Sequence, residues 1–267
     1  MKNLILIMTA AVLVISCKKN EAVSAAESDA PNFVSDSVVV NDSVKIGDSL
    51  TLKAFNKVLV FPSLKEKTLL DSIYFFAPKL QDFSKNGITA YMNSDKSNLF
   101  ESTKKESKDW ISDIGYSQEW YDNRNMEIVS NKNDFLHIRY SGSSYMGGAH
   151  DNYYFSERVF DLKNSKRLLL SDITSADEKT LSDLLMKNID KIPSGASDEN
   201  GDVANKEMLL IDKIPVTGNF YFDDQNLYFH YSPYEIAAFA AGDITIPVSW
   251  KEIETTLKPD FKRRMNL

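Results

Sequence analysis

Residues 140–161 read YSGSSYMGGAHDNYYFSERVFD, and the central part of the predicted fold depends on this stretch. Two sets of side chains alternate along residues 135–140, which lead into this stretch, and side chains alternate again along residues 153–160, near its end. A period of two residues is typical of a β-strand. The connection between the two patterns carries Gly147 and Gly148, which permit positive φ angles. We therefore expect two strands joined by a glycine-bearing loop.

The loop also carries side chains that suit recognition. Tyr145, Met146 and His150 lie in it, and aromatic side chains offer flat contact surfaces. One interpretation is that the loop is a binding surface. The other is that it is a long hairpin connection whose glycines only satisfy turn geometry.

The first residues have the pattern of a targeting signal. Lys2 precedes an apolar run over residues 4–15, which ends at Ser16-Cys17. A run of about 12 residues is short for a membrane-spanning helix, which needs about 20. Ser16-Cys17 resembles the lipobox of bacterial lipoproteins, in which the cysteine becomes the lipidated first residue. The alternative is an ordinary secretion signal with a chance cysteine.

We expect a lipoprotein signal peptide over residues 1–17, lipidation of Cys17 and a flexible tether over residues 18–34. Cys17 is the only cysteine in the sequence. If it is acylated, no thiol is left for a disulfide, a thiolate metal site or a cysteine nucleophile.

Composition favours a folded, acidic, exported protein. The formal net charge is -7, and loss of Lys2 with the signal peptide would make it about -8. Such a chain lacks the basic surface expected of a nucleic-acid-binding protein, but its charge would steer a basic partner toward it. Hydrophobic residues make up 43% of the sequence, which is enough for a sizeable core in one large or two small domains.

Local patterns predict strands and helices in blocks rather than in strict alternation, which is typical of an α+β fold. In the N-terminal half they are a β region over residues 33–61, a helix over 69–83 that Pro78 kinks or ends near Phe76, a helix over 97–111 and a strand over 120–130. In the C-terminal half they are a strand over 168–170, a helix opened by a Ser175–Glu178 capping box, a hairpin over 220–231, a strand over 244–250 and a Ser249–Glu252 capping box. Pro247 within the last strand indicates an edge or a bulge.

We expect two small α+β subdomains, each an antiparallel sheet packed with helices. They cover residues 35–135 and 136–257, and residues 258–267 are expected to be a solvated basic tail.

Three segments carry a resemblance to a known family: residues 145–162, 168–173 and 227–247, the last containing PYEIA at 233–237. In order and spacing they resemble the C-terminal domain shared by lysozyme-sensing anti-sigma factors of the RsiV type and the peptidoglycan deacetylase PdaC. Residues 35–135 are similar to the PdaC-type domain that precedes it.

The resemblance implies a recognition module, because the RsiV-type domain is an extracellular lysozyme sensor in the anti-sigma factors. The deacetylase activity of the relatives belongs to a separate domain with an Asp and a His-x-x-x-His metal site. The present sequence has no such histidine pair and no apolar run long enough to span a membrane. Neither the membrane-spanning role nor the deacetylase activity therefore carries over.

The sequence contains no recognisable catalytic motif, and we predict no catalytic residue, no metal site and no cofactor. It lacks Gly-x-Ser-x-Gly and a phosphate-binding glycine loop. A zinc site from His150, His230 and a carboxylate is conceivable if the two hairpins lie side by side. Glu235 could act as an acid or base, or could accept backbone amides and hold the turn after Pro233.

We expect ligand binding at two aromatic segments brought together by the fold. The candidate residues are Tyr145, Met146, Gly147, Gly148, His150, Asn152, Tyr231, Tyr234 and Glu235. Tyrosine is over-represented at binding hot spots. The alternative is that these tyrosines pack the two hairpins against each other.

The sequence thus predicts a non-enzymatic, lipid-anchored binding module on the periplasmic face or in the outer membrane of a bacterial envelope. Expected partners are the membrane, through the lipid on Cys17, and lysozyme or peptidoglycan fragments, but not nucleic acid. Alternatives are a glycan hydrolase or deacetylase with a site near His150 and Glu235, and a scaffolding lipoprotein that binds another envelope protein.

Overall fold

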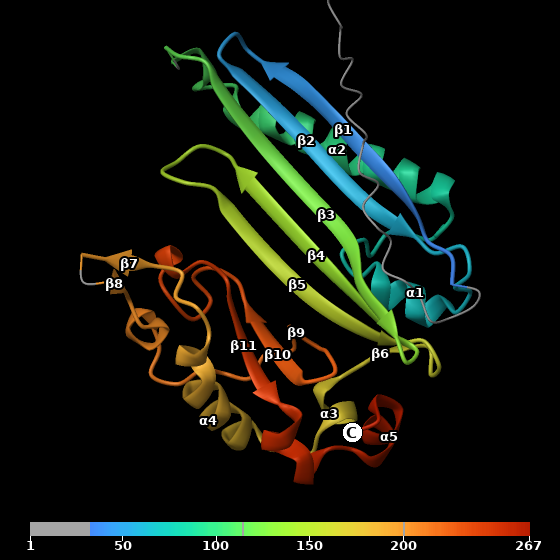
Figure 1. The fold of residues 1–267 in the computed structure, drawn as a ribbon. Helices are drawn as coiled ribbons and strands as arrows, with labels where there is room; N and C mark the ends of the chain where they lie inside the picture. The colour runs from blue at the N-terminus through green and yellow to red at the C-terminus, as the bar shows by residue number, and fades with distance from the viewer. Residues whose placement is uncertain (1–32, 114, 200) are drawn as a thin grey trace, which may run out of the picture.

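The computed structural model describes residues 33–113, 115–199 and 201–267. The predicted signal peptide with Cys17 and the tether up to residue 32 lie outside these residues. The fold is α+β and centres on a six-stranded sheet in sequential strand order. Its strands are β1 (Asp36–Ile46), β2 (Leu50–Val60), β3 (Gln118–Lys132), β4 (Phe135–Tyr145), β5 (Asn152–Asp161) and β6 (Lys166–Arg167) (Figure 1).

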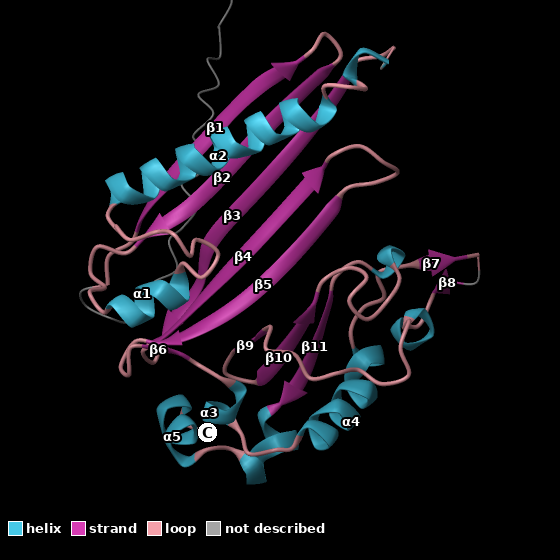
Figure 2. Cartoon of the chain, turned by 180° about the vertical axis from the view of Figure 1, so that it is seen from behind, coloured by secondary structure: helices cyan, strands magenta, loops and turns pink. Residues whose placement is uncertain are grey.

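The parallel β2–β3 pair departs from the purely antiparallel sheets that we expected. The other neighbouring strands of this sheet are antiparallel. Parallel neighbours need a long crossover connection, and helices α1 (Lys67–Ile73) and α2 (Lys85–Ser107) supply it. Both helices cover the same face of the sheet and leave the opposite face free of helices (Figures 1 and 2).

The helix predictions were partly right. α1 ends at Ile73, before Pro78, in agreement with the predicted stop near Phe76. The second helix begins at Lys85 rather than residue 97, and Ser84 caps it by accepting a hydrogen bond from the Gly87 amide. Its first half buries only Ile88 and Met92, so the apolar repeat there is too sparse to reveal it.

The β4–β5 hairpin confirms the pattern around residues 140–161. Leu136, Ile138 and Phe160 lie on its helix-covered face and are almost fully buried beside α1 and α2. The alternate positions, including Ser141 and Phe155, point to the other face. The C-terminal part covers one end of this second face, where Phe135 and Val159 are buried, and the end that carries Ser141 and Phe155 is less buried.

The C-terminal part adds a three-stranded antiparallel sheet with the order β11-β10-β9 beside β5 (Figure 1). The residues between Leu168 and Met265 bury most of a second hydrophobic core. Pro247 lies on β11, an edge strand, which is the first of the two expected alternatives. The elements of this part are α3 (Leu170–Ile173), α4 (Glu178–Asn188), β7 (Ser197–Asp198), β8 (Gly201–Asp202), β9 (Phe220–Phe222), β10 (Asn226–Tyr231), β11 (Ile244–Ser249), α5 (Pro259–Met265) and short 3-10 turns, including Trp250–Thr256.

Two local predictions in this part were wrong. Leu168–Leu170 is not a strand, because the strand is β6 at Lys166–Arg167 and α3 begins at Leu170. The helix after it is capped by Asp177, whose side chain accepts from the Thr180 amide, and not by Ser175, which bonds to Thr256 instead. The Ser249–Glu252 capping box is confirmed.

The basic tail is not solvated. Residues 259–265 form α5, which buries Phe261 and Met265 in the C-terminal core. Arg264 makes a buried ion pair with Asp161 at 2.7 Å. The apolar residues of the tail are spaced by four, so one face of a short helix packs while Lys262 and Arg263 remain outside.

The predicted division between residues 135 and 136 falls after the first residue of β4. The six-stranded sheet continues across this point, since β3 pairs with β4 along its length. Residues 33 and 34, expected to belong to the tether, also contact the fold: Phe33 packs on Phe61, and the Val34 amide donates to Ser63. In the part of the chain that the structure describes, no helix is long and apolar enough to cross a membrane.

Candidate functional site

The predicted recognition loop connects β4 and β5 at one end of the hairpin. Gly147 has φ +85°, and a Cβ there would meet Trp120 at 3.1 Å, while Gly148 has φ +118°. The Tyr145 hydroxyl donates to the Gly148 carbonyl at 3.0 Å, and Met146 packs against the apolar cluster around Trp120. The positive φ angles explain why glycine occupies both positions, as expected for glycines that satisfy turn geometry. Asn152 begins β5 and is exposed.

The fold brings His150 and Tyr234 together, although they are far apart in the sequence. The two rings lie 6.1 Å apart, and the Tyr234 hydroxyl is 3.4 Å from His150 Nε2. Phe239, which the sequence prediction missed, stacks on His150 at 4.2 Å and meets Tyr153 edge-on at 5.6 Å. Tyr234 is 56% exposed, so this aromatic cluster of His150, Tyr153, Tyr234 and Phe239 is open to solvent.

Two predicted residues have structural roles instead. Tyr231 is fully buried, and its hydroxyl donates to the Pro215 carbonyl at 2.6 Å. Burial raises its pKa well above the usual range. The Glu235 carboxylate accepts from the Ser232 amide at 2.9 Å and holds the turn after Pro233, which was one of its two predicted roles. Tyr231 is therefore a core residue, unlike Tyr234.

A groove of about 600 Å³ crosses the helix-free face of the six-stranded sheet. Strand register aligns its side chains in rows: Phe55 pairs with Asn123, Asn123 with Ser143, and Ser143 with Tyr153. The lining residues are Phe55, Asn123, Arg124, Asn125, Ser141, Gly142, Ser143, Tyr153 and Phe155. Tyr153 also belongs to the aromatic cluster, so groove and cluster are continuous.

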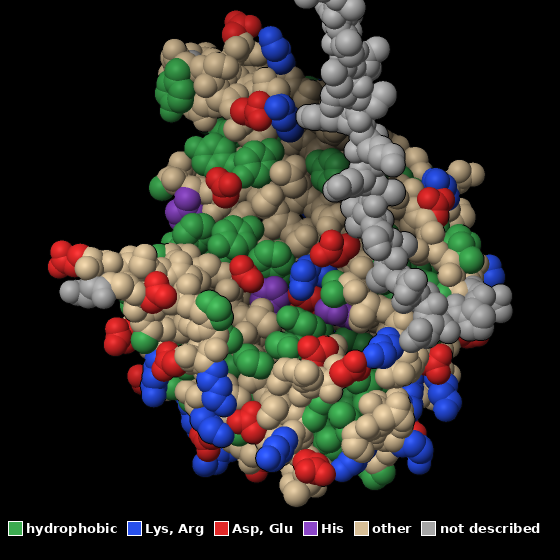
Figure 3. Space-filling model, viewed as in Figure 1, with side chains coloured by type: hydrophobic (Ala, Val, Ile, Leu, Met, Phe, Trp, Pro, Cys, Tyr) green, Lys and Arg blue, Asp and Glu red, His purple; other side chains and the backbone are tan. Residues whose placement is uncertain are grey.

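The groove is aromatic and amide-rich rather than charged. Arg124 is its one charged lining residue in the described chain, and it forms ion pairs with Asp95 of α2 at 2.9 Å and Asp122 at 2.8 Å. The other polar groups are hydroxyls and the amides of Asn123 and Asn125. Figure 3 shows this side of the molecule, where hydrophobic, acidic and histidine side chains intermix without a continuous area of one charge.

A buried polar cluster lies where β10 packs beside β4 and β5. Glu157 is fully buried and accepts from Arg139 Nε at 2.7 Å. Its two oxygens also lie 2.6 Å from His137 Nε2 and 2.9 Å from His230 Nδ1. Burial alone would raise the pKa of Glu157, but the hydrogen bonds from His137 and His230 and the Arg139 bond lower it far below its usual range. This carboxylate therefore stays ionised and joins the two sheets.

The two histidines of this cluster are each fixed by an aromatic ring. Tyr221 stacks on His137 and Phe155 stacks on His230, both at 4.9 Å between ring centroids. His230 Nε2 also lies 3.1 Å from Asp243. Sequence reasoning missed this cluster because its members come from β4, β5 and β10, and only the strand alternation hinted that His137, Arg139 and Glu157 share one face.

The conceivable zinc site from His150 and His230 does not form. His230 is bonded to Glu157 and Asp243, whereas His150 bonds to the Asp151 carbonyl and stacks on Phe239. Across residues 33–113, 115–199 and 201–267, no group of three or more His, Cys, Asp or Glu side chains could hold a metal ion. Asp223 accepts from the Gln225 and Asn226 amides and is a turn residue of the β9–β10 hairpin.

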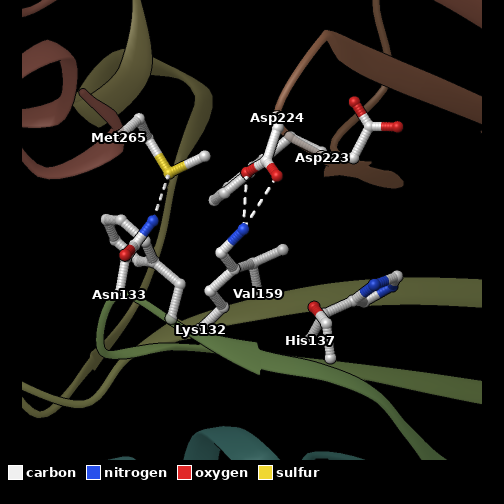
Figure 4. A pocket seen from close by; sticks show the side chains of 10 residues that line it. Lys132, Asn133, His137, Val159, Asp223, Asp224 and Met265 are labelled. Carbon is white, nitrogen blue, oxygen red and sulfur yellow. Dashed lines mark hydrogen bonds and ion pairs between the residues drawn. The ribbon is translucent and has the colours of Figure 1, made fainter. Parts of the chain in front are cut away.

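A smaller pocket of about 140 Å³ lies where the turns of β3–β4 and β9–β10 meet α5 (Figure 4). Lys132 Nζ reaches both Asp224 oxygens, at 2.7 and 3.0 Å, and the Asn133 amide lies 3.6 Å from Met265 Sδ. His137 and Val159 line the same pocket from β4 and β5. These contacts join the β3–β4 turn to the C-terminal part of the fold.

Comparison with known families assigns part of the chain. Residues 168–251 match the family described as "Protein of unknown function (DUF3298)", so the chain contains a DUF3298 domain. That domain lies within the predicted C-terminal subdomain of residues 136–257. The comparison with curated proteins found no match.

Two solved structures of DUF3298 proteins have a fold similar to that of this chain. A member of the DUF3298 family from Bacteroides fragilis has a TM-score of 0.66 and 21% sequence identity, covering 88% of this chain and 98% of that one. A DUF3298 family protein from Pseudomonas aeruginosa PAO1 has a TM-score of 0.50 and 13% identity, covering 86% of this chain and 96% of that one. Neither finding names the PdaC-type or RsiV-type families, so that resemblance stays a prediction.

Proposed function

We propose that the protein is an envelope-anchored, non-enzymatic binding module for a cell-wall-related ligand, and that peptidoglycan fragments are its first candidate ligand. The groove on the helix-free face carries this proposal. It combines partly exposed aromatic rings with uncharged hydrogen-bonding groups on a regular strand framework. Sites of this kind use a few placed polar groups for orientation and apolar surface for contact.

The chemistry of the groove favours a saccharide over a strongly charged ligand. A sugar ring presents apolar C–H faces, which suit Phe55, Tyr153 and Phe155, and hydroxyls, which suit asparagine amides. Each amide offers both donors and acceptors. The guanidinium of Arg124 is already paired with carboxylates, so the groove offers no free charge for an ionic ligand.

Lysozyme is the second candidate ligand. The resemblance to RsiV-type sensors favours it, and the net charge of -7 would steer a basic protein toward this chain. The exposed cluster of His150, Tyr234 and Phe239 at the end of the groove would then form part of the contact surface. Lipidation of Cys17 would hold either ligand complex at the envelope.

Calorimetry on the full-length chain in neutral detergent tests the proposal. Soluble peptidoglycan fragments and lysozyme are titrated separately into the wild type and into Asn123→Ala and Tyr153→Leu. Each substitution should weaken fragment binding about tenfold or more, which corresponds to about 1.4 kcal/mol. Asn93→Ala is the matched control, because Asn93 is an exposed amide on α2, on the opposite face of the sheet.

Three results would contradict the proposal. The first is no saturable heat with either ligand, and the second is an equal loss of affinity in the Asn93→Ala control. The third is a change in the fragments themselves. If the protein only binds them, chromatography after long incubation should show an unchanged profile. Consumption of the fragments would identify an enzyme instead.

A further inference from the structure

All arginines of the sequence except two form ion pairs with carboxylates. Arg139 pairs with the buried Glu157, Arg264 pairs with the buried Asp161, and Arg124 and Arg263 also contact carboxylates. The remaining two arginines of the sequence are Arg158 and Arg167. Within the described residues, neither has a carboxylate within 4.0 Å, although the chain has 38 acidic residues against 31 basic ones.

The two unpaired arginines are neighbours. Arg158 lies on β5 and Arg167 on β6, where Arg167 is the register partner of Phe160. Arg158 precedes Phe160 by two positions on the same strand, so both arginines project from the helix-covered face of the sheet. This face is opposite to the proposed ligand groove, which makes the two sites independent.

A partly exposed aromatic ring packs against Arg158. Phe75, just after α1, is 39% exposed, and the Arg158 guanidinium carbon lies 3.2 Å from its ring centroid. The ring of Phe75 also packs edge-on against Tyr140, with 5.2 Å between the ring centroids. The Tyr140 hydroxyl donates its hydrogen bond to the Ile73 carbonyl. The surroundings therefore orient the Arg158 guanidinium without neutralising its charge.

The hydrogen-bonding groups of both arginines are incompletely satisfied. The Nε atoms of Arg158 and Arg167 are buried and have no hydrogen-bond partner. Arg167 donates once, from Nη2 to the Gly218 carbonyl at 3.1 Å. Buried donors without acceptors are uncommon and cost free energy, so each such group requires an explanation.

Charge repulsion adds to this cost. Burial and the neighbouring Arg167 lower the pKa of Arg158 to about 10, and burial lowers the pKa of Arg167. Both side chains remain cationic at neutral pH. Two like charges in a partly buried setting are stabilised only when an opposite charge joins them.

We propose that Arg158 and Arg167 bind a small oxyanion, a carboxylate or phosphate group, at the junction of β5, β6 and the end of α1. Guanidinium groups form paired, charge-assisted hydrogen bonds with both kinds of anion. The anion would supply the hydrogen-bond acceptors and the negative charge that the described residues do not provide to these two arginines. Phe75 would cover one side of the Arg158 guanidinium and hold its plane in position.

The test uses thermal unfolding and calorimetry of the full-length chain in neutral detergent. Potassium phosphate and potassium acetate are each compared with potassium chloride at pH 7 and equal ionic strength. We expect saturable stabilisation of the wild type by at least one of the two oxyanions, and which of them acts identifies the group. Binding should be about tenfold weaker or more in Arg158→Gln and Arg167→Gln.

The control is Arg263→Gln, which removes the same charge from an exposed ion pair on α5 and should leave anion binding unchanged. Arginine Nε–H resonances of the wild type give a readout that needs no substitution: those of Arg158 and Arg167 should shift on titration, and that of Arg263 should not. Absence of a saturable response to both anions would overturn the proposal. Equal losses in Arg263→Gln and Arg158→Gln would also overturn it.

Discussion

At the scale of single residues, Glu157 is the buried charge on which the junction of the two sheets depends. It accepts hydrogen bonds from Arg139 and contacts both His137 and His230. Breaking a buried ion pair by removing one partner leaves the other charge uncompensated. We therefore expect Glu157→Gln to lower the free energy of unfolding at pH 7 by about 3–5 kcal/mol, as measured by urea unfolding.

The same residue predicts a direction for pH dependence. The folded-state pKa of Glu157 is lowered, so its contribution is fully present above the unfolded-state pKa of about 4.3 and is lost as the pH falls below it. The difference in stability between wild type and Glu157→Gln should shrink from pH 5 toward pH 2. Glu101→Gln on exposed α2 is the control and should show no such trend. A constant difference down to pH 2 would contradict the assignment.

Two tyrosines of the predicted site should behave differently. Tyr231 is fully buried with a hydrogen bond to Pro215, whereas Tyr234 is 56% exposed. Tyr231→Phe should cost about 1–2 kcal/mol in unfolding experiments, because a buried carbonyl loses its donor. Tyr234→Phe should change stability by less than about 0.5 kcal/mol. Equal effects would show that the two residues do not divide into core and surface.

The sequence could not distinguish these residues. Tyr231 and Tyr234 both stand in an aromatic segment, and no local pattern shows which one a distant element will cover. Strand register places His137, Arg139 and Glu157 on one face of the β4–β5 hairpin. Their meeting with His230 depends on the packing of β10 beside β5, which no short-range signal contains.

At the scale of elements, the C-terminal helix shows how a charged segment can hide a packing face. Phe261 is 2% exposed and contacts Phe135, Phe222 and Trp250. Phe261→Ala should lower the free energy of unfolding by about 3–5 kcal/mol, measured by chemical denaturation. Lys262→Ala is the matched control on the same helix and should cost less than about 1 kcal/mol, because its ion pair with Glu254 is largely exposed.

The elements that the sequence predicted well are those with local signals. The β4–β5 hairpin, the β9–β10 hairpin and the stop of α1 before Pro78 follow from alternation, turn residues and proline geometry. α2 was predicted too short because its first half buries few apolar residues, and α5 was missed because three basic residues stand around its two apolar ones. In both cases tertiary contacts outweigh the local pattern.

At the scale of the whole molecule, the six-stranded sheet joins segments that the sequence divided. The predicted subdomains cover residues 35–135 and 136–257, yet β3 and β4 lie on either side of this division and pair with each other. We expect neither half to fold alone, because separation would expose the edge of β3 and the buried Met126 and Ile138. Circular dichroism and NMR spectra of the two fragments test this, and a well-dispersed spectrum from residues 136–267 alone would contradict it.

The long-range arrangement also produces the proposed site. The groove arises because the crossover through α1 and α2 places both helices on one face, which leaves the rows from Phe55 to Tyr153 uncovered on the other. The sequence indicated the loop at residues 145–152, together with Tyr231, Tyr234 and Glu235, as the binding region. The structure instead places that loop at one end of a longer surface, most of which comes from strand positions without any motif.

The measurement that tests the central claim most directly is NMR mapping of the full-length chain during titration with soluble peptidoglycan fragments. The proposed function predicts saturable shifts of the side-chain amides of Asn123 and Asn125 and of backbone amides near Ser143 and Tyr153. The side-chain amide of Asn93 on α2 should stay unchanged. Absence of shifts, or shifts confined to the helix-covered face, would contradict the assignment of the groove as the ligand site.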